Sequence, residues 1–263
     1  MRKYLYIMKT QVMSNLQYIF DNIISFIGYF IMLLILFNVW KYLYSNPNEL
    51  INGYNMNQMT WYVIITELLW MTLGGRKLCN KISEEVKSGS ITYKINKPYQ
   101  YVLYCLFSHL GDIIIKGIIY FILSMLTGYL FLGSFPNITL LNLIVVILTC
   151  LLANIISTLL ITFIGLISFF IEDSGPFYWV YSKLILVLGT IFPIEYFPKF
   201  LQGFLKYSPV YVVSYGPAKL FVDFTYNNAI IIILAQFIYI IVSYTICTLV
   251  YKKGVKKINV NGG

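Results

Sequence analysis

Charged side chains are scarce in this sequence. Lys, Arg, Asp and Glu make up 11% of its 263 residues, whereas hydrophobic residues make up 59%. Soluble globular domains carry about 25% charged and about 45–50% apolar residues. So few charges cannot cover so apolar a core, so lipid must solvate much of the surface. The composition excludes an ordinary soluble enzyme and predicts an all-α, polytopic integral membrane protein.

Motifs for catalysis and metal binding are also absent. The chain has one histidine and four cysteines without a CxxC pair, and it contains no GxxxxGK[ST] phosphate-binding loop. Glu84 and Glu85 are adjacent, so on a helix they point in different directions and do not suit paired acid–base catalysis. We therefore expect no catalytic, cofactor or metal site in this chain.

The net charge of +9 comes from basic residues near the ends of the apolar runs. In a soluble protein this excess would suggest nucleic acid as a partner, but no basic patch interleaved with aromatic residues lies in a polar domain. Anionic lipid headgroups and membrane topology explain the pattern better. We expect membrane lipid, and no nucleic acid, as a partner.

A membrane-spanning helix needs about 20 apolar residues. Apolar runs at about 23–43, 59–73, 105–132, 138–171, 177–192 and 229–250 predict six spans in one membrane domain, residues 1–263. Residues 2–21 precede the first run, and Leu5, Met8, Val12, Leu16 and Ile19 recur there at a spacing of three to four. This amphipathic pattern predicts a helix on the membrane surface, and a cytoplasmic extension of the first span is the alternative.

The segment between the last two spans, residues 193–227, contains half of the chain's eight prolines: Pro193, Pro198, Pro209 and Pro217. This proline density argues against a straight spanning helix. We expect short, broken helices on the extracellular side, sheltered by the rest of the protein.

The basic residues also predict the orientation. Residues 2–9, 76–97 and 252–257 hold thirteen Lys and Arg, whereas the opposite loops hold four. The positive-inside rule then places both termini and the 74–101 loop in the cytoplasm, which agrees with six spans.

The 74–101 loop carries signals for a short helix. Ser83 is a suitable N-cap, with Glu84 and Glu85 in the first turn, Gly89 can end the helix in the left-handed conformation, and Pro98 follows. The predicted product is a short amphipathic cytoplasmic helix that can dock in a groove on a soluble partner.

At this loop the chain resembles the ABC-2 family of transporter permeases. The resemblance consists of Glu84 or Glu85, Ser88-Gly89, the run 91–95 and Lys97-Pro98. It continues in the order of the spans with Ile167 to Asp173, then Gly189, Pro193, Phe197-Pro198 and Leu201, then Ser208-Pro209 and Tyr215 to Pro217. Val210 departs from the family pattern, which usually has Phe after the proline.

The resemblance implies a six-span permease that forms a homodimer or heterodimer and is driven by two separate cytoplasmic ATPase subunits, which bind ATP and Mg. It also implies that the loop helix near 82–90 couples the permease to the ATPase. The predicted coupling residues are Ser83, Glu84, Glu85, Val86, Lys87, Ser88 and Gly89.

Two further groups of polar residues lie near the spans. Glu67 lies within an apolar run, where a charge is costly, so it is either a pathway or gate residue or has a structural partner or an interfacial position. Pro193, Phe197, Pro198 and Pro209 are the other possible gate residues. His109, Asp112 and Lys116 share a helical face, either as a proton relay or as a salt-bridged start of the third span.

The favoured function is therefore export of a peptide or antibiotic, a lipid or a polysaccharide precursor across a bacterial cytoplasmic membrane. A non-transport membrane scaffold or immunity protein and an integral membrane lipid-modifying enzyme are the alternatives. The enzyme predicts polar groups that converge at one membrane depth, which the sequence does not show, and the scaffold predicts no ATPase partner.

Overall fold

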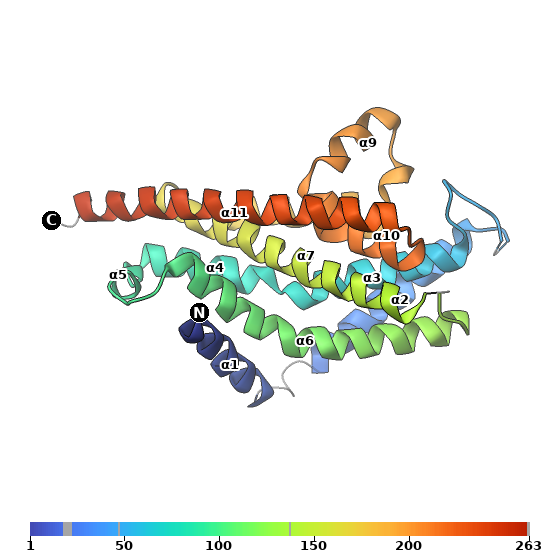
Figure 1. Cartoon of the computed structure of the whole chain (residues 1–263), viewed down its shortest axis with the longest axis horizontal. Coiled ribbons are helices and arrows are strands. Elements are labelled where there is room, and N and C mark those ends of the chain that lie inside the picture. Colours follow the sequence, from blue (N-terminus) through green and yellow to red (C-terminus); the bar gives the residue numbers. More distant parts are fainter. Residues whose placement is uncertain (18–22, 47, 137, 262–263) are drawn as a thin grey trace.

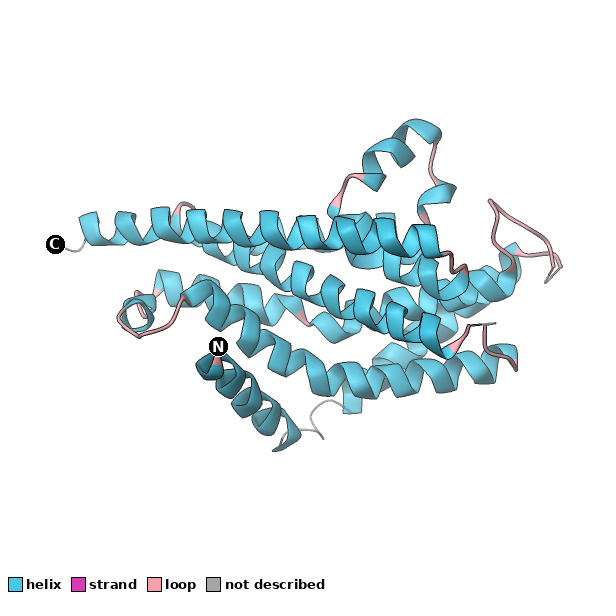
Figure 2. Cartoon of the chain, in the orientation of Figure 1, coloured by secondary structure: helices cyan, strands magenta, loops and turns pink. Residues whose placement is uncertain are grey.

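The computed structural model describes residues 1–17, 23–46, 48–136 and 138–261 as helices joined by short turns, with no strand in these ranges (Figures 1 and 2). The helices are α1 (Arg2–Gln17), α2 (Ile23–Leu43), α3 (Met56–Leu73), α4 (Gly75–Lys87), α5 (Ile91–Ile95), α6 (Tyr101–Leu132), α7 (Leu140–Leu166), η2 (Ile167–Phe169), α8 (Gly175–Ile185), η3 (Leu186–Ile191), η4 (Ile194–Tyr196), α9 (Lys199–Lys206), η5 (Tyr211–Tyr215), α10 (Gly216–Val222) and α11 (Tyr226–Asn261).

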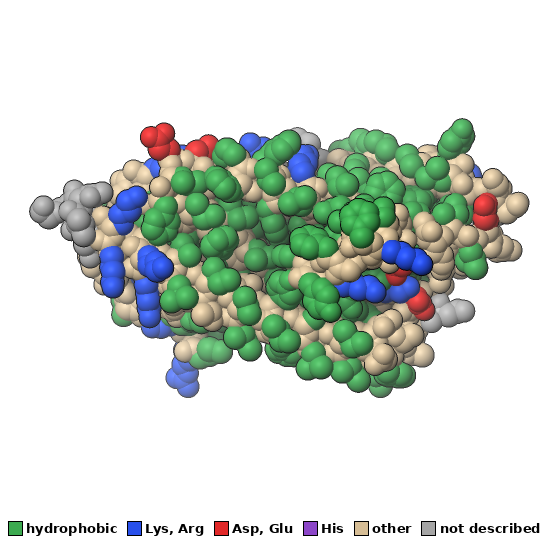
Figure 3. Space-filling model, turned by 90° about the horizontal axis from the view of Figure 1, so that it is seen from above, with side chains coloured by type: hydrophobic (Ala, Val, Ile, Leu, Met, Phe, Trp, Pro, Cys, Tyr) green, Lys and Arg blue, Asp and Glu red, His purple; other side chains and the backbone are tan. Residues whose placement is uncertain are grey.

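Four helical stretches in the described part of the chain are long and apolar enough to cross a membrane: Ser25–Leu43, Tyr101–Leu132, Leu140–Phe169 and Tyr226–Lys257. Much of their apolar surface is exposed. On α6 the exposed apolar side chains include Ile118, Ile122 and Leu126, and on α11 they include Leu234 and Ile238. Hydrophobic side chains cover much of the face seen in Figure 3, and Lys and Arg side chains gather toward one end, with a smaller basic group in the other half. This surface suits lipid rather than water.

Helix α3 is the central element of the bundle, because nearly all of its side chains are buried. It begins with a reciprocal capping box, in which Asn55 Oδ1 accepts from the Gln58 amide at 2.8 Å and Gln58 Oε1 accepts from the Asn55 amide at 3.1 Å. It ends at Gly74, whose φ of +50° lies in the left-handed region. Helix α3 therefore has a defined start and a sharp end.

The N-terminus, α5 and the C-terminus lie toward the same end of the elongated molecule (Figure 1). The loop between α2 and α3 lies toward the other end. The two ends differ in charge, since the first carries α5, much of α4 and the end of α11, with the clusters of Lys and Arg at 76–97 and 252–257. The clustering of the basic segments at one end is the arrangement that the charge bias requires.

Helix α1 is a separate element that packs against the first half of α6. Tyr4 is its buried residue, stacks on Phe107 with the ring centroids 5.5 Å apart, and accepts a hydrogen bond from the Gln100 amide. Met8 and Val12 of the expected apolar stripe are half-buried, because α6 covers one side of α1. Leu5 and Leu16 are exposed, and the position of α1 on the membrane surface stays a prediction. Ile19, the last residue of the stripe, lies outside the described residues.

The proline-rich segment 193–227 is divided into η4, α9, η5 and α10. Pro193 and Pro198 each stand directly before a helix, as N-cap residues with extended backbone. Helix α9 stands out from the bundle in Figure 1, whereas α10 is buried against α3 and α7. Proline placement therefore explains where the chain changes direction.

Candidate functional site

Helix α4 begins directly after the sharp turn at Gly74 and buries one face. Leu78, Cys79 and Ile82 form this face. The face packs tightly against α7, since a Cβ atom on Gly165 would lie 2.9 Å from Ile82 Cβ. The contact fixes α4 to a long apolar helix and leaves its opposite face open.

Ser83 does not cap a helix, contrary to the sequence-based expectation. It lies within α4, is buried, and its hydroxyl lies 2.9 Å from that of Ser168. Helix α4 starts at Gly75, eight residues before Ser83. Leu78 and Ile82, four residues apart, extend the amphipathic pattern back toward Gly74. Lys77 and Lys81, each directly before one of these apolar residues, obscured that pattern in the sequence.

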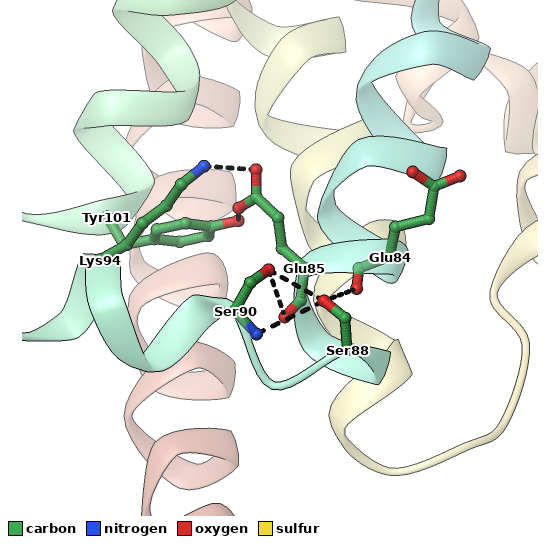
Figure 4. A network of polar contacts seen from close by, with 6 residues as sticks. All are labelled: Glu84, Glu85, Ser88, Ser90, Lys94 and Tyr101. Atoms are coloured by element: carbon green, nitrogen blue, oxygen red, sulfur yellow. Dashed lines mark hydrogen bonds and ion pairs between the residues drawn. The ribbon is translucent and has the colours of Figure 1, made fainter.

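Glu85 joins three elements at the end of α4 (Figure 4). Its carboxylate pairs with Lys94 of α5 and accepts a hydrogen bond from the Tyr101 hydroxyl of α6 at 2.7 Å. Burial alone would lower the pKa of Lys94, but the hydrogen bond and the charge of Glu85 raise it on balance. The two side chains are therefore held as a charged, partly buried pair.

The turn after α4 is built by serines around a glycine. Ser88 Oγ donates to the Glu84 carbonyl at 2.7 Å, and Ser90 Oγ donates to the Glu85 carbonyl at 3.4 Å. Gly89 has a φ of +70°, as the sequence predicts for a residue that ends this helix. These bonds satisfy carbonyls at the end of the helix and hold α4 and α5 in a compact α4–α5 turn (residues 84–95).

The outer side of the α4–α5 turn is available to a partner. Glu84, Lys87 and Ser88 are exposed, and the Glu84 carboxylate points away from the Glu85 cluster in Figure 4. Lys87 lies 3.4 Å from Asp173, in the loop before α8. The Gly175 amide donates to Asp173 and, together with Lys87, holds the pKa of that carboxyl below its usual value. This side is thus polar, carries both signs of charge, and has a defined shape.

Of the predicted coupling residues, the structure therefore exposes Glu84, Lys87 and Ser88. It uses Ser83 and Glu85 for internal contacts, and it leaves Val86 and Gly89 partly buried. Their assignment to ATPase coupling stays a prediction.

Glu67 lies deep inside the bundle, fully buried on α3. Neither of its carboxylate oxygens has a hydrogen-bond partner among the described residues. The neighbouring Thr66 hydroxyl donates to the Thr190 carbonyl at 2.9 Å, and Tyr62 donates to the Gly189 carbonyl at 2.7 Å. These bonds tie α3 to η3, the π-helical stretch before Pro193. The structure thus brings the part of α3 that carries Glu67 close to the start of the proline-rich segment.

Aromatic and charged groups hold the proline-rich segment in place. The Tyr196 hydroxyl lies 3.0 Å from that of Tyr44 and donates to the Ile51 carbonyl, and Tyr215 donates to Glu195 at 2.5 Å. Phe197 packs edge-on against Phe192. The remaining gate candidates Pro193, Pro198 and Pro209 lie at helix starts along this segment, and their gating role stays a prediction.

His109, Asp112 and Lys116 all line one polar cavity between α1, α4 and α6. His109 Nδ1 lies 3.9 Å from Asp112 Oδ2, but Asp112 also accepts hydrogen bonds from Gln11 and Asn15 of α1. The sequence placed the three residues on one helical face correctly. It gave no signal for the contribution of α1, which lies about a hundred residues away along the chain.

A comparison with protein families completes this description. The family model described as ABC-2 family transporter protein matches residues 7–262. The chain belongs to this family. As an ABC-2 protein it is a multi-pass membrane component of a transporter, and the resemblance noted in the sequence is confirmed. No curated protein matches the chain.

Proposed function

We propose that this ABC-2 protein is the membrane permease of an ATP-driven exporter, and that separate ATPase subunits drive it through the α4–α5 turn. The observation that carries the proposal is the construction of this turn. Its outer side is exposed and charged, and its inner side is fixed to α6 through Glu85. The part of α4 directly before the turn packs on α7 through Ile82. A force applied to the outside would therefore move the long helices instead of deforming a loose loop.

The same contacts suggest a route across the membrane. Helix α4 continues into α3 through Gly74, and α3 is bonded to η3 through Thr66 and Tyr62. The proline-rich segment follows directly after η3. A tilt of α4 caused by closure of the ATPases would thus reach the proposed gate at Pro193, Phe197, Pro198 and Pro209 through packed elements.

Six spans remain the proposed topology. The four long apolar helices supply four of them. Helix α3 has 18 residues, which corresponds to about 27 Å of helix, and α8 continues into η3. Both are close to the length that a hydrocarbon core of about 30 Å requires. This count puts both termini and the α4–α5 turn on one side, which the basic residues assign to the cytoplasm of a bacterial cell.

A second permease copy or a paralogue would complete the path. Exposed apolar side chains on one face of α2, including Ile31, Ile35 and Val39, would contact that copy or lipid. Two ATPases, each with bound ATP and Mg, would then serve the two permeases. The proposed cargo is a peptide or antibiotic, a lipid or a polysaccharide precursor.

Co-purification from membranes tests the proposal. We expect the affinity-tagged chain to bring down an ATPase and the complex to hydrolyse ATP. Glu84→Lys should lower recovery of the ATPase at least about tenfold, because it reverses a charge at the docking surface. Glu49→Lys is the control, since Glu49 is also exposed but lies in the loop between α2 and α3, at the other end of the molecule.

Complexes that never contain an ATPase would overturn the proposal and leave a non-transport membrane scaffold as the better function. An equal loss of ATPase with both substitutions would show that the α4–α5 turn is not the docking surface.

A further inference from the structure

The polar cavity between α1, α4 and α6 is large and carries an excess of positive charge. Its volume is about 310 Å³, room for roughly ten water molecules at about 30 Å³ each. Its charged and polar lining includes Asn15, Lys77, Lys81, His109, Asp112 and Lys116. We call it the basic cavity.

The acidic groups of the basic cavity are already engaged. Asp112 Oδ1 accepts from Gln11 at 2.8 Å and from Asn15 at 2.7 Å. Glu85, at the edge of the cavity, pairs with Lys94 and Tyr101. These bonds satisfy the two carboxylates without help from the cavity lysines.

The basic groups are not engaged in this way. Within the described ranges, no carboxylate lies within 4.0 Å of the ammonium group of Lys77, Lys81 or Lys116. Lys116 is also held close to the turn between α3 and α4, since its Nζ lies 3.6 Å from the position of a Cβ on Gly74. Three ammonium groups around one cavity leave a positive potential that an anion would neutralise.

One further feature of the wall suits an anion. Helix α4 has 13 residues, and its N-cap Gly74, which lines the cavity, provides no side-chain cap. A helix N-terminus carries unsatisfied amides and a partial positive charge, which favours phosphate groups.

We propose that the basic cavity binds a phosphate group, either that of an anionic membrane lipid or free inorganic phosphate. Lys77 and Lys116 supply charge, and the start of α4 contributes its dipole. Helix α1 forms one wall and exposes Leu5, Tyr6, Met13 and Leu16 on its outer side. These apolar side chains suit the headgroup region of a bilayer, where a lipid phosphate lies. The site does not depend on the ATPase.

Lipid binding to the purified full-length chain in detergent tests the proposal. Native mass spectrometry would compare dioleoyl phosphatidic acid with dioleoyl glycerol, which differs from it only by lacking the phosphate. Inorganic phosphate would be added in a separate series, with the melting temperature as the measurement. Preferential binding of phosphatidic acid identifies the lipid, and stabilisation by inorganic phosphate alone identifies the free anion.

The variant K77Q/K116Q should weaken phosphate-dependent binding at least about tenfold, because each lysine near a headgroup contributes about 1 kcal/mol. K199Q/K206Q removes the same charge on α9 and should bind as the parent does. K77R/K116R keeps the charge and should retain most of the binding. If K77Q/K116Q fails to fold, Lys81→Gln replaces it, since Lys81 is exposed and lines the same cavity.

Absence of any preference for phosphate over its lipid control, with no effect of inorganic phosphate, would overturn the proposal. An equal loss of binding in K77Q/K116Q and K199Q/K206Q would overturn it too, because the effect would then reflect net charge and not the cavity.

Discussion

Glu67 places an ionisable carboxyl at a fully buried position of α3, where the described residues offer it no hydrogen bond. The sequence located this residue correctly in an apolar run and left open whether it has a structural partner. The structure provides none in its described part, and the role of Glu67 in a pathway or gate stays a prediction.

We expect Glu67→Gln to melt at or above the temperature of the parent in detergent, because it replaces a buried ionisable group by a neutral amide of the same shape without removing a partner. Export by the same variant should fall if Glu67 contributes to the pathway. Glu49→Gln, an exposed change, should stay within about 0.5 kcal/mol of the parent. A loss of more than about 1 kcal/mol for Glu67→Gln would show that the carboxyl has a partner after all.

Gly128 allows the closest approach between α3 and α6. A Cβ atom there would lie 2.2 Å from an atom of the Trp61 ring, and Trp61 is 2% exposed and cannot move away. Gly128→Ala should therefore lower the free energy of unfolding by about 1–3 kcal/mol. Gly203→Ala is the matched control, since nothing lies within 4 Å of its new methyl group. Thermal unfolding of both variants measures the difference, and equal stability would contradict the close packing.

At the scale of elements, the pair formed by Glu85 and Lys94 holds α5 against α4. We expect Glu85→Gln to lower the free energy of unfolding by about 1–3 kcal/mol near neutral pH, because it weakens a charge-assisted hydrogen bond. Glu84→Gln, one residue earlier and exposed, should change it by less than about 0.5 kcal/mol.

The pH dependence of this difference follows from Lys94. Its folded-state pKa is raised above the ordinary value of 10.5. The stabilisation is therefore complete below that value and is lost as the pH rises through the raised pKa. Unfolding of the parent and of Glu85→Gln across alkaline pH should show two curves that converge. Curves that stay parallel would mean that another group accounts for the difference.

The long apolar helices could be predicted from hydropathy because each is apolar over more than 18 residues. The start of α4 could not, since Lys77 and Lys81 interrupt the apolar pattern and Gly74 turns the chain without a loop. The contacts of Glu85 could not be predicted from the sequence either. Lys94 and Tyr101 lie nine and sixteen residues further along, beyond the reach of spacing rules within one helix.

At the scale of the whole molecule, the fold brings distant segments together at one end. The basic cavity combines residues of α1, the turn between α3 and α4, and α6. No local pattern relates these segments, so only the placement of α1 against α6 discloses the cavity. The distribution of Lys and Arg predicted which segments lie on the same side of the membrane. It did not predict that these segments enclose a cavity.

Topology can be tested with thiol labelling of intact cells. Tyr93→Cys, on α5, should react with a membrane-impermeant reagent only after permeabilisation, whereas Phe200→Cys, on α9, should react without it. Both positions are well exposed, at 78% and 80%. Background labelling of the native thiols should be low. Cys79, Cys105 and Cys247 are buried, and the half-buried Cys150 lies within the apolar helix α7. Burial also raises the pKa of the Cys79 thiol. Labelling of Tyr93→Cys from outside would invert the topology and remove the α4–α5 turn from the reach of any ATPase.

Helix α11 has 36 residues and therefore a length of about 54 Å, well beyond the roughly 30 Å of a hydrocarbon core. Its C-terminal part packs against α6, where Tyr251 stacks on Tyr101 with the ring centroids 5.2 Å apart. A rigid rod of this length that rocked by about 10° about one end would displace its other end by roughly 9 Å, about the diameter of a helix. A tilt imposed beside the last lysines would thereby be magnified at the opposite end of the bundle.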